Sequence, residues 1–456
     1  MHKKQVKRLG ESMLEWLNEY IFGVSVPVIL ICAGVFYGMR LGWFHLRHTV
    51  RIFRVLTERG SGSGTSSARA LSLALAGTLG VGNIVGVSAA IASGGFGAIF
   101  WMWVSAFFAM ILKYAEIVLA LRYRRYDACG RPHGAAMYYI KAFIDRCGYK
   151  TLGSVAAGIF ALLCIANSVT MGSVIQINAI VSAGDGVLGI PPMLCGAALA
   201  LITFFIIGKG SERIVSITSG LVPLMTLGYL VLSVAVLALR AERIPYAFGM
   251  IFSQAFEADS AIGGIGGFLL SDKLRYGAMR GLVSNEAGCG TSPAAHAVSN
   301  EKSPAKQGVW GIFEVFADTI LLCTVTALVV IVSYDAADAA SGDHMMMTLN
   351  AYSAVLGDAA AYFMTAAVLC FGFATIVCWA HYGMESVAYL SERRAAKKIF
   401  ILVYCASVFV GACSSSEIIW QVADLAIGAM TLINVIVICM MSKEVREETQ
   451  LWLGDA

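Results

Sequence analysis

Charged residues are scarce in this sequence. Asp, Glu, Lys and Arg make up 14% of its 456 residues, whereas about a quarter of the residues in a soluble domain are charged. Hydrophobic residues make up 58%, and the mean hydropathy is +0.74. So few charges could not cover the surface of a water-soluble fold of this length. The composition therefore excludes a soluble enzyme and predicts a protein embedded in a lipid bilayer.

Cysteines at metal-binding or redox spacing are also lacking. The twelve cysteines are scattered singly, without a C-x-x-C pair or a Cys/His cluster. Most lie in apolar runs, where cysteine behaves as a small hydrophobic residue, so no disulfide framework is expected. No cleavable signal peptide is expected either, because the first apolar run begins only near Ile21, after a polar and acidic stretch.

Long apolar runs are what the sequence has in abundance. A helix that spans a bilayer needs about 20 apolar residues. Eleven runs meet or approach this length, and we expect an all-α membrane protein with about eleven transmembrane helices. The expected spans are 21–43, 71–92, 97–121, 152–182, 190–208, 214–239, 261–283, 308–333, 360–383, 399–413 and 417–441, of which the tenth is short.

Basic residues are distributed unevenly between the loops. Lys and Arg gather after the first, third, fifth, seventh, ninth and last spans, whereas the loops around 183–190 and at 334–360 have none. Since cytoplasmic loops are enriched in Lys and Arg, this pattern predicts an external N-terminus and a cytoplasmic C-terminus. Two groups of basic residues conflict with this orientation: Lys3, Lys4, Lys7 and Arg8, and Arg240 with Arg243. We keep the orientation because the six basic loops agree on it.

The span count itself predicts an inverted repeat. Setting the first span aside leaves two sets of five, and the second set must run inverted because five is odd. The first helix of each repeat is often broken in such transporters. We expect an N-terminal segment at 1–70, repeats at 71–240 and 241–442, and a cytoplasmic tail at 443–456. Glycines interrupt the first core span and the matching sixth: Gly77, Gly80, Gly82 and Gly86, and Gly263, Gly264, Gly266, Gly267, Gly277, Gly281, Gly288 and Gly290.

The stretch AGTLGVGNIVG at 76–86 has three interpretations. A phosphate-binding loop would lie between a strand and a helix and would carry a lysine, but apolar runs flank this stretch and no lysine follows the glycines. A face of small residues for helix packing is the second interpretation. The third is an unwound segment whose N–H groups bind a substrate carboxylate and whose carbonyls bind a cation, next to Thr78 and Asn83. Such free backbone is tolerated at this depth only where it lines a cavity.

Polar residues gather again in RYGAMRGLVSNEAGCGTSPAAHA at 275–297. Intramembrane ionisable groups such as Glu286 usually face a cavity or one another, and Asn285 adds a neutral polar group beside it. The alternative is that this segment is a helix end that has reached the cytoplasmic water. The segment is long enough to begin within the membrane and to end in that water. Cys289 has no base at a recognisable spacing, so a nucleophilic role is not expected.

Several single residues are weaker candidates. In the fourth span, Gln176 is the candidate pocket member, and Thr375 in the ninth span offers a hydroxyl oxygen suited to Na⁺, although a lone threonine usually bonds back to its own helix. Asp318 and Asp424 are buried acids with either structural or coupling roles. The remaining candidates are interpreted as structural: the i,i+3 pair Lys113 and Glu116, and His133, His296 and His381.

These motifs resemble the alanine/glycine:cation symporter family. The resemblance covers residues 70–440 and rests on GTLGVGNIVGVSAAIASGG, RGLVSNEAGCGTSPAAHA, FADTILLCTVTAL, FATIVCWAHYG and IIWQVAD. It implies sodium-coupled import of small neutral amino acids, chiefly alanine and glycine, across the cell membrane. It also implies the five-plus-five inverted repeat of the leucine-transporter type with one additional helix.

The resemblance also implies where the ligands bind. Substrate contacts would come from Thr78, Gly80, Gly82 and Asn83, from Gln176, and from Gly281 and Leu282. A sodium site would join Thr375 to Gly77 and Thr78. Five departures from the family's pattern affect the expected coupling ion or substrate. Val81 replaces a threonine, Ala374 the hydroxyl residue before Thr375, Cys289 a leucine and Ile433 a proline, and HGAAMYY at 133–139 replaces Gly-Gly-Pro-Met-Tyr-Tyr.

Three functions are compatible with these features. The first is a symporter that imports alanine or glycine with Na⁺ by alternating access, with proton coupling as its variant, which the loss of a hydroxyl at Ala374 makes conceivable. The second is a membrane-embedded enzyme that uses Cys289, Glu286 or His296. The third is a sensor that binds an amino acid without moving it, although no soluble signalling domain is recognisable.

Overall fold

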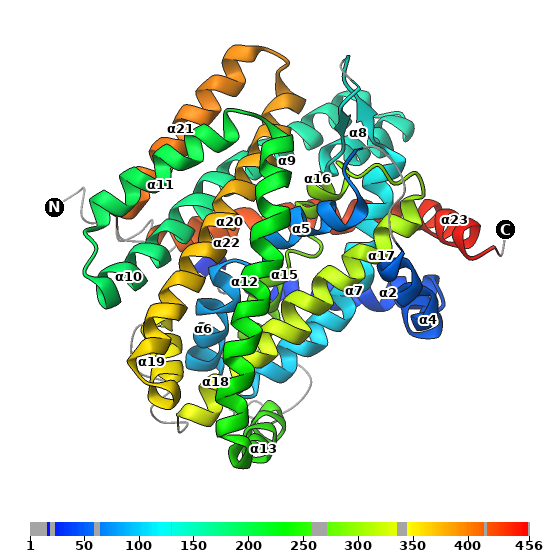
Figure 1. The fold of residues 1–456 in the computed structure, drawn as a ribbon. Helices are drawn as coiled ribbons and strands as arrows, with labels where there is room; N and C mark the ends of the chain where they lie inside the picture. Colours follow the sequence, from blue (N-terminus) through cyan, green and yellow to red (C-terminus); the bar gives the residue numbers. More distant parts are fainter. Residues whose placement is uncertain are drawn as a thin grey trace.

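The computed structural model of the protein describes residues 16–18, 23–58, 64–128, 130–256, 271–334, 344–414 and 417–454. These residues are almost wholly helical (Figure 1). Their strands are confined to one antiparallel hairpin, in which β1 (Arg125–Tyr126) pairs with β2 (Pro132–His133). The expected all-α architecture is confirmed.

Eight helical segments of the described chain are long and apolar enough to cross a membrane. Large apolar side chains on them remain exposed, as Leu224, Leu227 and Val231 do on one of the longest, which is the pattern of helices that face lipid. The chain is a multi-pass membrane protein. The eight segments are α2 (Gly23–Arg40), α7 (Ala98–Arg122), Lys150–Leu188, α12 (Ser211–Leu239), Pro304–Ser333, α20 (Asp358–Leu390), α21 (Arg394–Ala412) and α22 (Glu417–Met440).

Two of these segments are composite helices with a π-helical stretch in the middle. The first comprises α9 (Lys150–Val169), η3 (Thr170–Ile175) and α10 (Gln176–Leu188). The second comprises α17 (Pro304–Val315), η5 (Phe316–Cys323) and α18 (Thr324–Ser333). Since π-helical stretches are rare and concentrate at functional sites, the centre of each segment is a candidate position for such a site.

The other helices are shorter. Those that overlap the expected core spans are α5 (Ser67–Thr78), η2 (Val81–Asn83), α6 (Val85–Gly94), α11 (Pro192–Ile207) and α15 (Asp272–Asn285), and α16 (Ser292–His296) follows α15 before the next span. Those outside them are α3 (Phe44–Arg47), α4 (Thr49–Thr57), α8 (Ala136–Arg146), η4 (Ala241–Arg243), α13 (Ile244–Ala255), α19 (His344–Leu356) and α23 (Ser442–Leu453).

The expected breaks are found, but the second lies further along the chain than its glycines suggest. The first core span is split between α5 and α6, as predicted. In the sixth core span, expected at 261–283, α15 continues to Asn285 and the break occupies 286–291. The glycines at 263, 264, 266 and 267 lie outside the described residues.

Gly277 and Gly281 do not interrupt a helix, which corrects the expectation. Both lie within α15, where α15 packs closely against α7. A Cβ atom at Gly277 would lie 2.2 Å from the Ala98 carbonyl oxygen, and one at Gly281 would lie 2.6 Å from Ser105 Oγ. These glycines therefore allow two helix backbones to approach, as small residues commonly do in membranes.

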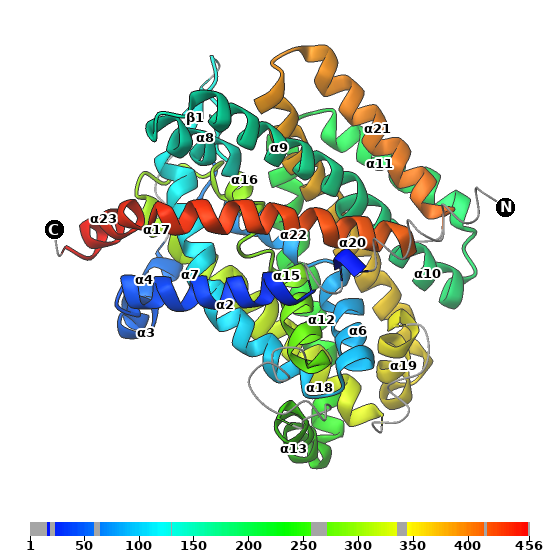
Figure 2. The same cartoon turned by 180° about the vertical axis from the view of Figure 1, so that it is seen from behind.

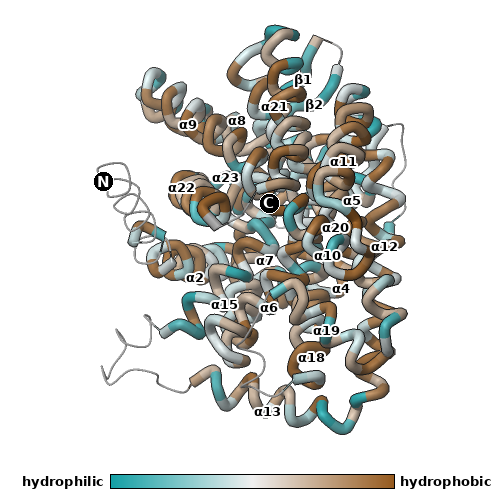
Figure 3. Tube along the Cα trace, turned by 90° about the vertical axis from the view of Figure 1, so that its left-hand side faces the viewer, coloured by the Kyte–Doolittle hydropathy of each residue, from teal (hydrophilic) through white to brown (hydrophobic). Residues whose placement is uncertain are grey.

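The helices pack as a bundle around the two breaks (Figures 1 and 2). Helix α7 packs against α15 and α17, and α20 packs against α5, α9, α10 and α12. On the periphery α11 lies beside α21, and the first span, α2, lies along α7 and α22. Hydrophobic residues extend over most of the bundle's helices (Figure 3). The breaks are thus enclosed by longer, continuous helices.

The C-terminal helix α23 is attached to the bundle through its acidic residues. Glu444 accepts hydrogen bonds from Arg146 and, at 2.6 Å, from Tyr123 Oη. Arg122, at the end of α7, lies 3.3 Å from Glu447 and 3.4 Å from Glu448. The carboxylates of α23 are therefore engaged on the side that faces α7 and α8 (Figure 2).

The β-hairpin is joined to α20 by His133. Its Nδ1 lies 2.9 Å from Glu385 Oε2, and its Nε2 lies 3.6 Å from Asp127 Oδ2. The hydrogen bond to Glu385 raises the pKa of His133 above its usual value, aided by the charges of both carboxylates and opposed by partial burial. The imidazolium form is therefore favoured in the folded protein.

A pH dependence follows from this raised pKa. The stability that His133 contributes is fully present below its unfolded pKa of about 6.5 and is lost as the pH rises through the folded value. We expect His133→Gln to lower the melting temperature at pH 6 and to have a smaller effect at pH 9. Thermal unfolding of the purified protein in detergent at both pH values measures this. An equal effect at both would contradict it.

Candidate functional site

The first break, between α5 and α6, is stabilised from a neighbouring helix. In an unbroken helix the Val81 N–H would donate to the Gly77 carbonyl, four residues earlier. It donates instead to Gln176 Oε1 at 3.1 Å. Gln176 is the first residue after the π-helical stretch η3, and its Nε2 donates to the Met171 carbonyl at 3.2 Å. Its side chain therefore satisfies backbone that the break leaves without a helical partner.

Two glycines of this break are required by close packing. A Cβ atom at Gly80 would lie 2.7 Å from Thr375 Oγ1 and 3.1 Å from Gln176 Oε1, and one at Gly77 would lie 2.7 Å from Tyr382 Oη. At Gly82 the nearest heavy atom would be 3.9 Å away. Gly77 and Gly80 thus hold the break against α10 and α20, whereas Gly82 has free space beside it.

Left-handed backbone forms the second break. Glu286 has φ 53°, and Gly288 and Gly290 have φ 82° and 78°. Glycine adopts such angles without steric cost, but Glu286 is a non-glycine residue in a sparsely populated region. Its carboxylate is held by the Thr291 hydroxyl, which donates to Oε2 at 2.6 Å. The strained residue therefore marks where α15 ends.

Glu116 fixes the second break from α7. Its Oε1 accepts from the Gly290 N–H at 2.8 Å and from Asn434 Nδ2 at 2.5 Å. Asn434, on α22, also donates to the Gly288 carbonyl at 2.9 Å. The expected pairing of Glu116 with Lys113 is wrong, because Glu116 is turned toward this break and its backbone donors.

Lys113 pairs instead with Glu314 on α17. Lys113 Nζ lies 3.4 Å from Glu314 Oε1 and donates to Ser292 Oγ at 2.5 Å, and both ionic side chains are 0% exposed. Glu314 Oε2 lies 2.9 Å from His296 Nε2, and Gln307 Nε2 lies 2.8 Å from His296 Nδ1. An imidazole protonated on Nε2 satisfies both contacts, so His296 has the structural role predicted for it.

A polar cluster joins the two breaks to η5. Asn83 Nδ2 donates to Asp318 Oδ1 at 2.8 Å and lies 3.1 Å from Ser284 Oγ. Ser284 and Thr319 each donate to Asp318 Oδ2 at 2.7 Å, and Asn285 Nδ2 donates to Thr319. All five side chains are buried, and Asn83 Oδ1 has no protein partner. Asp318 therefore collects oxygen-bearing side chains from three helices.

A small cavity lies between the breaks. Its volume of about 10 Å³ holds about one water molecule. Six of its lining residues were candidates from the sequence: Gly77, Thr78, Gly80, Gly82, Gln176 and Glu286. Five were not: Met171, Ile175, Val283, Trp379 and Trp420. The lining is half polar backbone and side chains and half bulky apolar groups.

Two other candidates, Asn83 and Thr375, lie near the cavity without lining it. Asn83 points into the Asp318 cluster. Thr375 Oγ1 lies 2.9 Å from the Ala76 carbonyl and 3.0 Å from the Phe371 carbonyl of its own helix. Its carbonyl partner on α5 is thus Ala76, the residue before the expected Gly77 and Thr78.

The remaining candidates do not line the cavity either. Gly281 and Leu282 are buried in α15, one turn before the break, and neither lines the cavity. Asp424 follows Trp420 by one turn on α22. The neighbouring positive charge is that of Arg280, whose guanidinium lies 5.4 Å from the centre of the Trp420 ring. Cys289 is fully buried, with Thr431 Oγ1 3.3 Å from its sulfur.

The sequence and fold were compared with known proteins. Residues 7–455 match the sodium:alanine symporter family. The sodium/alanine symporter AgcS of Methanococcus maripaludis is 33% identical over 445 residues, which are 96% of each chain. The amino-acid carrier protein AlsT of Bacillus subtilis is 34% identical over 430 residues, which are 94% of this chain and 88% of AlsT.

A solved structure shares the fold at low sequence identity. MhsT in complex with L-phenylalanine superposes with a TM-score of 0.57 at 15% identity, covering 83% of this chain and 89% of MhsT. The matched proteins are transporters and not enzymes, so the enzyme interpretation is set aside. With a match across nearly its whole length, the chain belongs to the sodium:alanine symporter family.

Proposed function

We propose that the chain imports a small neutral amino acid, alanine or glycine, together with Na⁺ by alternating access. Family membership supports amino-acid–cation symport as the class of activity. The observation that carries the finer proposal is the cavity between two helix breaks, lined by Gly80 and Gly82 on one side and Glu286 on the other. The inverted repeats at 71–240 and 241–442 remain part of this proposal.

The lining suits the two ends of a small zwitterion. Backbone N–H groups released at a helix break favour a carboxylate, and the buried carboxylate of Glu286 favours an ammonium group. Thr78, Gly80, Gly82 and Gln176 are proposed substrate contacts, and Asn83 supports them from behind. We do not retain Gly281 and Leu282, because they do not line the cavity. The indoles of Trp379 and Trp420 leave little volume for a large side chain.

Two groups of oxygens are candidates for the coupling ion, since Na⁺ prefers hard oxygen ligands. The first is Thr375 with the backbone of Gly77 and Thr78, where the Thr375 hydroxyl already meets an α5 carbonyl. The second is Asp318 with Ser284 and Asn83. The Oδ1 atom of Asn83 has no protein partner. The second group is favoured by its buried negative charge.

Single substitutions distinguish the two groups. We expect Asp318→Asn to raise the Na⁺ concentration for half-maximal alanine uptake at least about tenfold, since one charge is removed from the ligand set. Thr375→Val tests the first group in the same assay. Thr365→Val is the matched control, because Thr365 lies on the same helix and bonds to its own Ala361 carbonyl at 2.9 Å. An unchanged Na⁺ dependence in Asp318→Asn would remove the second group from consideration.

The function itself is tested in proteoliposomes. Radiolabelled alanine and glycine uptake is measured under a Na⁺ gradient, a K⁺ gradient or a proton gradient alone. Uptake driven only by Na⁺ supports the proposal, and uptake driven equally by protons assigns H⁺ as the coupling ion. Absence of any neutral amino-acid uptake overturns it, and tight binding without counterflow exchange identifies a sensor.

The proposed orientation has an external N-terminus and a cytoplasmic C-terminus. The basic residues that support it include Arg122, Arg124 and Arg125 at and after the end of α7, and Arg393 and Arg394 at the start of α21. A protease site added after residue 456 provides the test. It is expected to be cleaved in inside-out vesicles and protected in right-side-out vesicles.

A further inference from the structure

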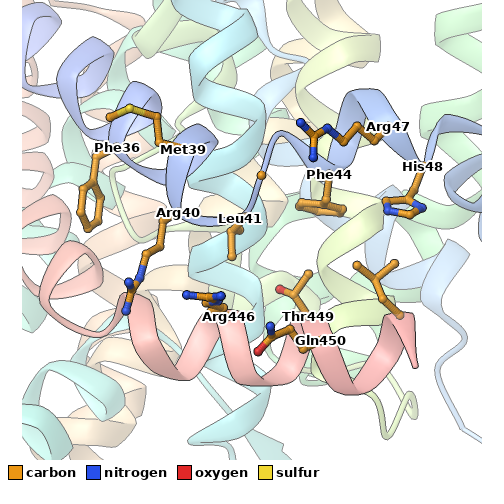
Figure 4. Close-up of a pocket in the computed structure, with 12 residues that line it drawn as sticks. Phe36, Met39, Arg40, Leu41, Phe44, Arg47, His48, Arg446, Thr449 and Gln450 are labelled. Carbon is orange, nitrogen blue, oxygen red and sulfur yellow. The ribbon is translucent and has the colours of Figure 1, made fainter. Parts of the chain in front are cut away.

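A second cavity, which shares no lining residue with the first, lies between the end of the first span and the C-terminal helix. It has a volume of about 600 Å³. Its walls come from α2, α3 and α23 (Figure 4). The lining residues are Phe36, Met39, Arg40, Leu41, Gly42, Phe44, Arg47, His48, Arg446, Thr449, Gln450 and Leu453. No proposed transport residue belongs to it.

The charge of this cavity is of one sign. Arg40, Arg47 and Arg446 line it, and none of its lining residues is acidic. Figure 4 shows Arg40 extending from α2 toward α23, where Arg446 lies on the facing surface. Within the described chain none of these three arginines forms an ion pair. Three exposed arginines thus line one cavity without a carboxylate partner.

The neighbouring acids are engaged elsewhere. Glu444 binds Arg146, while Glu447 and Glu448 lie within salt-bridge distance of Arg122. Helix α23 therefore directs its carboxylates toward α7 and α8 and directs Arg446 toward the cavity. The separation gives the cavity a net positive field that the protein does not neutralise.

The apolar part of the lining identifies the position relative to the bilayer. Arg40 is the last residue of the membrane span α2, and Phe36 and Met39 lie one turn or less before it with 38% and 65% of their surface exposed. Helix α4, which follows, exposes Val50 and Phe53. Exposed apolar side chains beside arginines are typical of segments at the interface between acyl chains and headgroups. The cavity thus spans that interface.

We propose that this cavity binds the headgroup of an anionic phospholipid. The phosphate would lie among Arg40, Arg47 and Arg446, and the acyl chains would run along Phe36 and Met39. Basic pockets between transmembrane helices are suited to such headgroups, and arginine forms bidentate hydrogen bonds with phosphate oxygens. A free phosphate would use the arginines but leave the exposed apolar wall without a partner. The lipid would hold α23 against α2 and is independent of the substrate site.

Native mass spectrometry of the full-length, delipidated protein tests this. Phosphatidylglycerol and phosphatidylcholine with identical acyl chains are titrated separately. We expect one phosphatidylglycerol to bind at least about tenfold more tightly than phosphatidylcholine, and Arg40→Gln/Arg47→Gln/Arg446→Gln to remove that preference. The matched control is Arg393→Gln/Arg394→Gln/Lys397→Gln, which removes the same charge from the exposed start of α21 and is expected to retain the preference.

A second variant tests the proposal independently if the triple mutant does not fold. Gln450→Glu introduces a carboxylate into the cavity lining and is expected to weaken phosphatidylglycerol binding while the melting temperature is maintained. Equal affinity for the two lipids, or an equal loss in the α21 control, would overturn the proposal. Displacement of the lipid by millimolar inorganic phosphate would also overturn it, because the apolar wall would then contribute nothing.

Discussion

Gly80→Ala is expected to slow amino-acid uptake at least about tenfold. The added methyl group would lie 2.7 Å from Thr375 Oγ1 and 3.1 Å from Gln176 Oε1, so the break between α5 and α6 would have to move away from both. Overpacking of this kind costs about 1–3 kcal/mol, and the affected side chains belong to the proposed ion and substrate sites. We expect the initial rate of alanine uptake in proteoliposomes to fall at least about tenfold.

Gly86→Ala is the control for this substitution. Gly86 lies in α6 after the same break, and a Cβ atom there would have no heavy atom within 4 Å. Since alanine favours a helix over glycine, uptake and melting temperature are expected to be maintained. Normal uptake by Gly80→Ala, with Gly86→Ala also normal, would show that the close approach at Gly80 is not needed for transport.

Lys113→Met is expected to have the largest effect on stability. It leaves the Glu314 carboxylate at 0% exposure without its ammonium partner and removes the donor to Ser292. Breaking a buried ion pair from one side costs about 3–5 kcal/mol. We expect the melting temperature in detergent to fall by about 5 °C or more.

The double variant Lys113→Met/Glu314→Gln separates charge from packing. It removes the unpaired carboxylate while preserving the shape of both side chains, and replacement of a complete buried pair is often nearly neutral. Partial or full recovery of the melting temperature is therefore expected. If the double variant is as unstable as Lys113→Met, the loss comes from packing of the lysine chain and not from the unpaired buried charge of Glu314.

The first break could be predicted because its signal is local. Gly77, Gly80 and Gly82 weaken a helix within six residues, and an asparagine in an apolar run indicates a polar environment. The second break was expected too early in the chain, because glycine has two uses in a membrane. At Gly277 and Gly281 it permits contact with α7, whereas at Gly288 and Gly290 it permits positive φ. Composition does not distinguish a close approach from a turn.

Contacts between side chains on different helices could not be predicted from local sequence patterns. The sequence spacing suggested Lys113 with Glu116, but these side chains bind α17 and the second break, which are far away in the chain. Asp318 was recognisable as a buried acid, yet its contact with Asn83 depends on how η5 meets the first break. Trp379 lies in the FATIVCWAHYG motif, but the sequence assigned it no role. Only the packing of the helices shows that it lines the cavity.

We expect the cavity between the breaks, with room for about one water molecule, to make this conformation of the protein a poor conductor of ions. An ion needs either its hydration shell or a replacement set of ligands to cross, because transfer of a bare charge into a low-dielectric interior costs on the order of 20 kcal/mol. A site this narrow supports no continuous file of water. In this conformation the membrane keeps its stored potential of about 2.3 kcal/mol per charge per 100 mV, and current is expected to flow only when a complete transport cycle carries it.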